Sequence, residues 1–206
     1  MCADTVTRLA IMAGTCGVWP SAALAAPVPE LRITVAVIDF AAIAPATRLR
    51  GEQEAERILK EAGIFPRWVD IGSDEQADLP PGAIILRILP EAGSMHDPKA
   101  LGVALALGPG AIYATIFFDR VCERAADPVL SKAGTSLAVL LGHVIVHEIG
   151  HLLLGTNSHS RSGLMSASWD LADMRAIARG RLKFASDEST KMRAEVARRN
   201  ARPEPR

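Results

Sequence analysis

Apolar and polar residues follow one another in blocks whose period changes along the chain, and each block predicts one element. A bounded apolar run rich in isoleucine and valine over residues 31–40 predicts a buried strand. In 45–62, apolar residues recur at three- and four-residue spacing between charged ones, which predicts an amphipathic helix ended by Gly63. A second strand follows over 65–71. Such a strand, helix and strand normally form parallel neighbours with a right-handed crossover.

The middle of the chain predicts three more strands, separated by loops. A polar, Pro-rich loop over 73–82 precedes a strand at 83–89, and the next loop carries His96. The apolar segments 101–107 and 111–121 flank a Gly-Pro-Gly turn, and both can be strands. One of them should lie at the edge of the sheet, where an extended peptide could add a further strand.

The last third of the chain is predicted to be helical. A strongly apolar segment over about 135–154 predicts a long helix, and Gly155 stands in the position of its C-terminal cap. Two amphipathic helices follow within 170–198. The apolar segment is long enough to span a membrane, but it contains three histidines and a glutamate, which would be costly in lipid on an isolated helix. We therefore expect the core helix of a globular protein, without stable membrane insertion.

The first residues have the pattern of an export signal. Arg8 precedes an apolar run over 9–19, and Ala23-Leu24-Ala25 supplies a small-x-small cleavage site. We therefore expect a signal peptide over 1–25, a secreted or periplasmic protein, and one α+β domain over 26–206.

Charge and cysteine content exclude several classes of protein. The chain has 23 basic and 23 acidic residues, so its formal net charge is zero and nothing indicates nucleic acid as a partner. Removal of the signal would leave Cys122 as the sole cysteine, so the mature chain could form no internal disulfide. We expect a monomer.

The candidate chemistry lies in the long apolar helix. Residues 147–151 are His-Glu-Ile-Gly-His, and His159 follows with Ser-Gly-Leu-Met at 162–165. Histidines four residues apart lie on one helix face, so both imidazoles can reach one ion. Zinc needs a third ligand and, in catalytic sites, leaves a fourth position for water. Glu148 is placed to take the proton of that water. His143, one turn earlier, is more simply a core residue.

These residues resemble the signature of the metzincin clan of zinc peptidases. The matching positions are His147, Glu148, His151, Gly155, His159 and Met165. The resemblance implies a zincin-like fold: a small mixed sheet, an N-terminal helix, an active-site helix, and C-terminal helices after a methionine turn. It also implies Zn²⁺ held by three histidines, with Glu148 as general base.

The spacing departs from that signature, and other third ligands stay open. Two intervals, from His151 to Gly155 and from Gly155 to His159, are each one residue longer than usual. Asp170 and Asp173 lie where some zincins place a downstream carboxylate, and Asn157 lies in the same turn. Carboxylate oxygen is an acceptable zinc ligand. The Gly-Leu-Met that follows His159 favours the histidine, because a methionine turn accompanies the histidine version of the site.

The expected function is therefore an exported zinc-dependent endopeptidase acting on a peptide or protein substrate. Two alternatives come from other classes: a zinc-binding module without turnover, or an amidase acting on a non-protein amide. A structural zinc site is closed by four protein ligands, usually with cysteine, and only Cys122 is available. Retention of Glu148 beside an open position favours catalysis.

Overall fold

Five strands form one mixed sheet in the computed structural model, which describes residues 30–72, 78–93, 97–105 and 112–201. The strands are β1 (Leu31–Asp39), β2 (Ile64–Asp70), β3 (Ile84–Leu89), β4 (Gly102–Ala104) and β5 (Tyr113–Phe117), in the spatial order β2-β1-β3-β5-β4. All neighbours are parallel except β4, which pairs antiparallel with β5. The short strand β4 is therefore one edge of the sheet.

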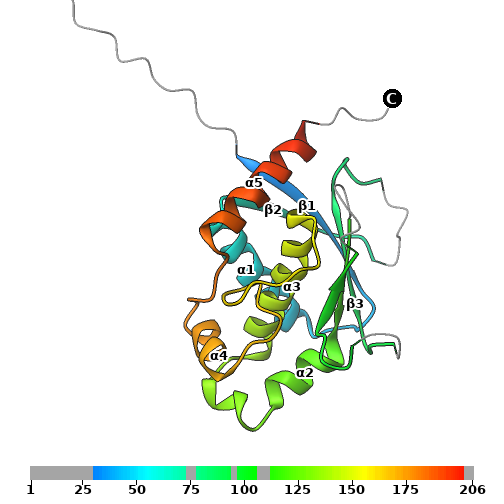
Figure 1. Ribbon diagram of the computed structural model, residues 1–206. Helices are drawn as coiled ribbons and strands as arrows, with labels where there is room; N and C mark the ends of the chain where they lie inside the picture. The colour runs from blue at the N-terminus through cyan, green and yellow to red at the C-terminus, as the bar shows by residue number, and fades with distance from the viewer. Residues whose placement is uncertain (1–29, 73–77, 94–96, 106–111, 202–206) are drawn as a thin grey trace, which may run out of the picture.

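The helices lie against one side of this sheet. They are α1 (Pro45–Glu61), α2 (Phe118–Ala126), the 3-10 helix η1 (Leu130–Ala133), α3 (Leu137–Leu154), α4 (Leu171–Ala178) and α5 (Ser186–Asn200). Figure 1 shows α1 and α3 beside the sheet, with α2 and α4 at one end of the molecule and α5 at the other. Helix α3 contacts α1, α2, α5, β4 and β5, so it occupies the centre of the fold.

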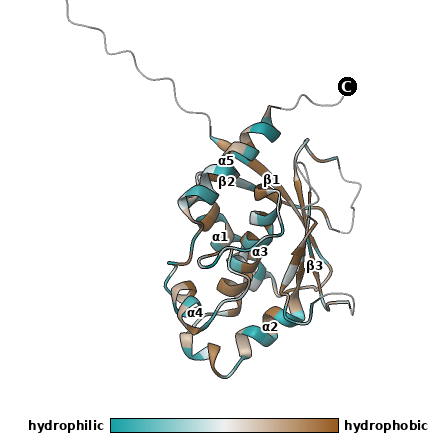
Figure 2. Cartoon of the chain, viewed as in Figure 1, coloured by the Kyte–Doolittle hydropathy of each residue, from teal (hydrophilic) through white to brown (hydrophobic). Residues whose placement is uncertain are grey.

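Alternation along the strands explains the core. Ile33, Val35 and Val37 of β1 belong to the hydrophobic cluster under the helices, whereas Arg32 is exposed and Thr34 is half-buried. Figure 2 shows brown, apolar stretches along α3, and nearly all residues of this helix are buried because it is covered on nearly all sides. A helix in that position holds its side chains rigidly.

One helix of the described residues, α3, is long and apolar enough to cross a membrane. Of its 18-residue window, 78% is buried inside the fold. This burial is typical of a core helix, as the sequence predicts.

The structure confirms the mixed α+β class and most of the predicted elements. The predicted strands at 31–40, 65–71 and 83–89 correspond to β1, β2 and β3, and β1 and β2 are parallel as expected. The motif helix and the two C-terminal helices are present. The expected signal peptide, His96 and the Gly-Pro-Gly turn lie outside the described residues.

The predicted strand over 111–121 is wrong in its second half. Strand β5 ends at Phe117, and helix α2 begins at Phe118. Phe118, Val121 and Ala125 face the core at spacings of three and four, which is a helical period. The mostly apolar run 111–118 extends across the boundary at Phe118 and hid this change of period. The preceding segment, 101–107, also forms a shorter strand than predicted, Gly102–Ala104.

Candidate metal centre and cleft

Helix α3 brings the first two histidines together. Ser136 caps its start, where the hydroxyl accepts the Val139 N–H, and Gly155 ends it with a left-handed φ of 65°. One turn separates His147 from His151, and their Nε2 atoms lie 3.1 Å apart. Two nitrogens bound at 2.0–2.1 Å to a tetrahedral zinc lie about 3.3 Å apart. The spacing of the two side chains therefore suits this ion.

Backbone carbonyls fix the orientation of both rings. The Nδ1–H of His147 donates to the Leu164 carbonyl at 2.8 Å, and that of His151 donates to the Thr156 carbonyl at 2.9 Å. Each neutral ring then presents the lone pair of Nε2 to the other ring. Two such lone pairs repel one another unless a cation lies between them. The donor set therefore fits a metal ion.

Burial keeps these imidazoles in their metal-binding form. The pKa of His147 is lowered to about 4, chiefly by burial and further by the nearby His151 and His159, against the opposing bond to Leu164. Burial also lowers the pKa of His151. Both side chains are therefore neutral at neutral pH, as metal ligation requires.

His159 reaches the same point from a loop. The possible ligand atoms of His147, His151 and His159 all lie within 4.8 Å of one another, and we call these three residues the histidine cluster. The ring centroid of His159 is 5.4 Å from that of His147 and 4.9 Å from that of His151. Unlike the other two, His159 is exposed. The two longer sequence intervals therefore still bring this histidine to the cluster.

Hydrogen bonds of Ser160 hold the loop that carries His159. The Ser160 N–H donates to the Met165 carbonyl at 2.8 Å, and the Ser160 hydroxyl donates to the buried carboxylate of Glu188. Met165 is 1% exposed and lies against Gly150 of α3, where a Cβ atom would come within 2.6 Å of the methionine sulfur. Met165 of the expected turn is thus a core residue that packs against α3.

Glu148 lies beside the histidines and against the edge strand. Its side chain is 5% exposed, and this burial raises the pKa of its carboxyl to about 8. A Cβ atom at Gly102 of β4 would lie 2.9 Å from Glu148 Oε1 and 2.7 Å from the Thr115 carbonyl. Only glycine leaves room here for the carboxylate.

The competing ligands have other roles in the structure. The Asp170 carboxylate accepts the N–H groups of Ala172 and Asp173, and the Asp173 carboxylate accepts the Asp170 N–H, so the pair caps α4. Neither belongs to the histidine cluster. Asn157 lines the cleft described below. His143 is fully buried, as expected of a core residue, and its Nδ1–H donates to the Val139 carbonyl.

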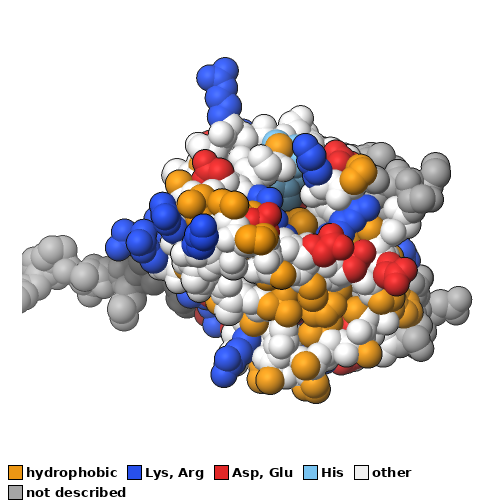
Figure 3. Space-filling view, turned by 90° about the horizontal axis from the view of Figure 1, so that it is seen from below, with side chains coloured by type: hydrophobic (Ala, Val, Ile, Leu, Met, Phe, Trp, Pro, Cys, Tyr) orange, Lys and Arg blue, Asp and Glu red, His pale blue; other side chains and the backbone are white. Residues whose placement is uncertain are grey.

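A cleft of about 990 Å³ opens over the cluster. One wall is the turn at 97–100 together with β4, and the opposite wall is the segment 166–170. Helix α2 contributes charged side chains at one end: Arg120, Glu123 and Arg124. Figure 3 shows pale blue histidine atoms in a hollow with blue and red atoms around its rim.

Sequence reasoning missed Gly102 and α2 as contributors to this cleft, and it missed the contact between Trp169 and His147. Gly102 fits against Glu148, the Trp169 ring lies edge-on to His147 with centroids 5.7 Å apart, and α2 lines one end. The sequence did contain a signal for α2, because the charged positions 120, 123, 124 and 127 have helical spacing. The other contacts join distant segments and leave no local pattern.

Comparison with solved structures places the fold. The structure is similar to that of archaemetzincin from Methanopyrus kandleri, with a TM-score of 0.51 and 16% identity over 82% of this chain and 99% of that one. A zinc-dependent peptidase from Methanocorpusculum labreanum gives 0.49 and 13% over 77% and 99%. Metalloproteinase-II from Bacteroides fragilis gives 0.48 and 10% over 81% and 53%. No model of a known family and no curated protein matches the sequence.

The first of these likenesses shows that the chain has an archaemetzincin-like fold. This confirms the zincin-like architecture expected from the sequence.

Proposed function

We propose that the protein is a zinc-dependent endopeptidase of the metzincin type. The observation that carries the proposal is the histidine cluster, whose rings are oriented by backbone carbonyls, beside a buried Glu148 and in an open cleft. His147, His151 and His159 would hold the ion. The likeness in fold to archaemetzincin supports the same conclusion.

The chain's own residues then account for the chemistry. When bound there, zinc supplies a Lewis acid that polarises a carbonyl and lowers the pKa of water toward about 7. Glu148 takes the proton of the attacking water and delivers it to the leaving amine. In the metal-free fold its carboxyl is protonated at neutral pH, because its pKa is about 8. A nearby cation favours the ionised form, which is the form that a general base needs.

The edge strand supports a peptide substrate. Strand β4 pairs with β5 on one side, and residues 101–104 line the cleft on the other. An extended peptide can therefore form backbone hydrogen bonds along β4 while its scissile bond lies near the cluster. An amidase acting on a non-protein amide would not need exposed backbone hydrogen-bonding groups along this strand.

The test separates metal binding from catalysis. Glu148→Gln should retain one zinc per chain and lose peptide hydrolysis by about 10²- to 10⁴-fold, the usual contribution of a general base. Zinc is measured by atomic absorption, and hydrolysis with a quenched-fluorescence peptide library. The matched control is Glu123→Gln, an exposed carboxylate at the cleft rim. Hydrolysis by Glu148→Gln at the wild-type rate would reject the mechanism.

A zinc-binding module without turnover is the second candidate. It predicts that the wild-type protein binds zinc and peptides but hydrolyses no member of the library. The proximity of Glu148 to the cluster favours catalysis over this alternative. A buried carboxyl that has no hydrogen-bond partner among the described residues is costly to retain in a module that only binds.

We also propose that the protein is exported and acts as a monomer. Support for export comes from the signal-like sequence over 1–25. N-terminal sequencing of the protein recovered outside the cytoplasm should begin near residue 26. Light scattering should give the mass of one chain.

A further inference from the structure

Two arginines of α2 reach opposite walls of the cleft. Arg120 and Arg124 are four residues apart, so their side chains leave the same helix face. Within the described part of the chain neither forms an ion pair, whereas Arg57 and Arg198 pair with glutamates of their own helices. The guanidinium groups of Arg120 and Arg124 instead donate to backbone carbonyls on other segments.

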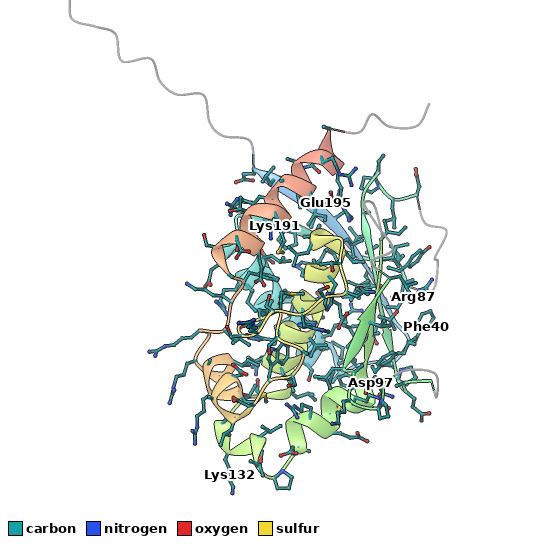
Figure 4. All side chains as sticks on the ribbon, in the orientation of Figure 1. Phe40, Arg87, Asp97, Lys132, Lys191 and Glu195 are labelled. Atoms are coloured by element: carbon teal, nitrogen blue, oxygen red, sulfur yellow. The ribbon has the colours of Figure 1, made fainter. Side chains whose placement is uncertain are left out.

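Arg120 holds the wall that carries the edge strand. Its Nη1 donates to the Ala100 carbonyl at 2.8 Å and also to the Asp97 carbonyl. Figure 4 labels Asp97 at the end of the sheet nearest α2. The turn at 97–100 leads through Leu101 directly into β4, and β4 contains Gly102, against which Glu148 packs. The position of this turn therefore sets where the edge strand begins.

Arg124 holds the opposite wall. Its Nη2 donates to the carbonyl of Trp169, a residue 45 positions away in the sequence. The Trp169 ring is 5% exposed and meets His147 edge-on, at an interplanar angle of 88°. This hydrogen bond fixes the end of the segment 166–170, immediately before α4 begins.

We propose that Arg120 and Arg124 are positioning residues that set the width of the cleft for an extended peptide. The proposal rests on the proposed function and concerns the peptide-binding part of that site. Because both arginines lie on one rigid helix, the distance between their two acceptor segments is fixed by α2. Hydrogen bonds that involve a charged group are stronger than neutral ones, so each bond holds its wall firmly.

The test compares two hydroxamates on the zinc-loaded protein. Acetohydroxamate probes the metal alone, and a pentaalanine hydroxamate adds an extended chain that must fit between the walls. The ratio of their affinities, measured by calorimetry, reports the contribution of the walls. Arg120→Ala removes two charge-assisted hydrogen bonds and Arg124→Ala removes one, and each variant should lower the pentaalanine affinity by about 10- to 100-fold. Acetohydroxamate affinity and zinc content should stay within about twofold.

Two further variants separate positioning from general damage. Arg124→Lys keeps a cationic donor and should restore part of the lost affinity. Arg175→Ala removes an exposed arginine of α4 and should change neither affinity. Hydrogen exchange should rise over 97–104 in Arg120→Ala and over 166–170 in Arg124→Ala, each without a rise in the other wall.

The outcomes are distinct from those for the proposed function. Equal weakening of both hydroxamates, an unchanged affinity ratio, or no preference of the wild-type protein for the longer probe would each overturn the role of the two arginines. Absence of peptide hydrolysis by the wild-type protein, with the expected change in affinity ratio, would reject the proposed catalysis and leave the positioning role in place.

Discussion

The two parts of the histidine cluster are held in different ways. His147 and His151 lie on α3, and helix geometry alone puts them on one face. His159 lies in the exposed loop after Gly155, and its position depends on contacts from Met165, Ser160 and Glu188. The helical part is preorganised, whereas the loop part must be kept in order by tertiary contacts. Differences in the response to mutation should therefore separate the two parts.

The largest expected effect is on zinc affinity. His151→Ala should weaken zinc binding by more than 100-fold, because loss of an outer-shell partner alone costs about 10- to 100-fold. His159→Ala should also weaken zinc binding sharply, but by a smaller factor. Part of the binding energy of an exposed loop ligand is offset by the entropy that the loop loses when it is ordered. Competition with a fluorescent chelator measures both.

The control for this comparison is His143→Ala, which removes a buried histidine of the same helix outside the cluster. It should destabilise the fold and leave zinc affinity near the wild-type value in folded protein. Unchanged zinc affinity in His159→Ala would show that His159, the loop part of the cluster, is not a zinc ligand.

The next effect concerns the contact between the two parts. Gly150→Ala would place a Cβ atom 2.6 Å from the Met165 sulfur and 2.8 Å from a Phe184 ring carbon. Overpacking of this kind costs about 1–3 kcal/mol, against a gain of at most about 1 kcal/mol from helix propensity. We expect lower stability in urea and weaker zinc binding, because Leu164, which orients His147, precedes Met165. Gly93→Ala, with no atom within 4 Å, should be nearly neutral.

The sequence predicted the helical part of the site better than the loop part, for a physical reason. Positions four apart on α3 fix two ligands and a glutamate through local geometry. The turn that carries His159 depends on a bond from Ser160 to Glu188, 28 residues later, which no local pattern reveals. The same holds for the bond from Arg124 to Trp169. The sheet edge was predicted. The change from strand to helix at Phe118 was not, because the mostly apolar run 111–118 extends across it.

A smaller effect is the pH dependence of the metal-free fold. His147 has a folded pKa of about 4, below its unfolded 6.5, so stability rises with pH across that interval. Glu148 has a folded pKa of about 8, above its unfolded 4.5, so stability falls as pH rises between these values. The two oppose one another up to pH 6.5, and from there to pH 8 Glu148 alone should remove about 2 kcal/mol.

Urea unfolding in the presence of a chelator, at pH 6.5 and pH 8, measures this loss. Glu148→Gln should abolish it, since the amide does not titrate. A fall of the same size in the variant would show that another group is responsible. The comparison locates the titration in the helical part of the site, away from the His159 loop.

The smallest effect decides between His159 and the downstream carboxylates. Asp170→Ala removes the N-cap of α4 and should cost about 1 kcal/mol of stability. Zinc affinity should be unchanged, because the carboxylate accepts the N–H groups of Ala172 and Asp173 and lies outside the histidine cluster. Asp170→Ser, which can still cap the helix, should recover most of the stability. The serine restores the cap of α4 but not the carboxylate. Loss of zinc in both variants would therefore show that the third ligand is Asp170, at the start of α4, and not His159.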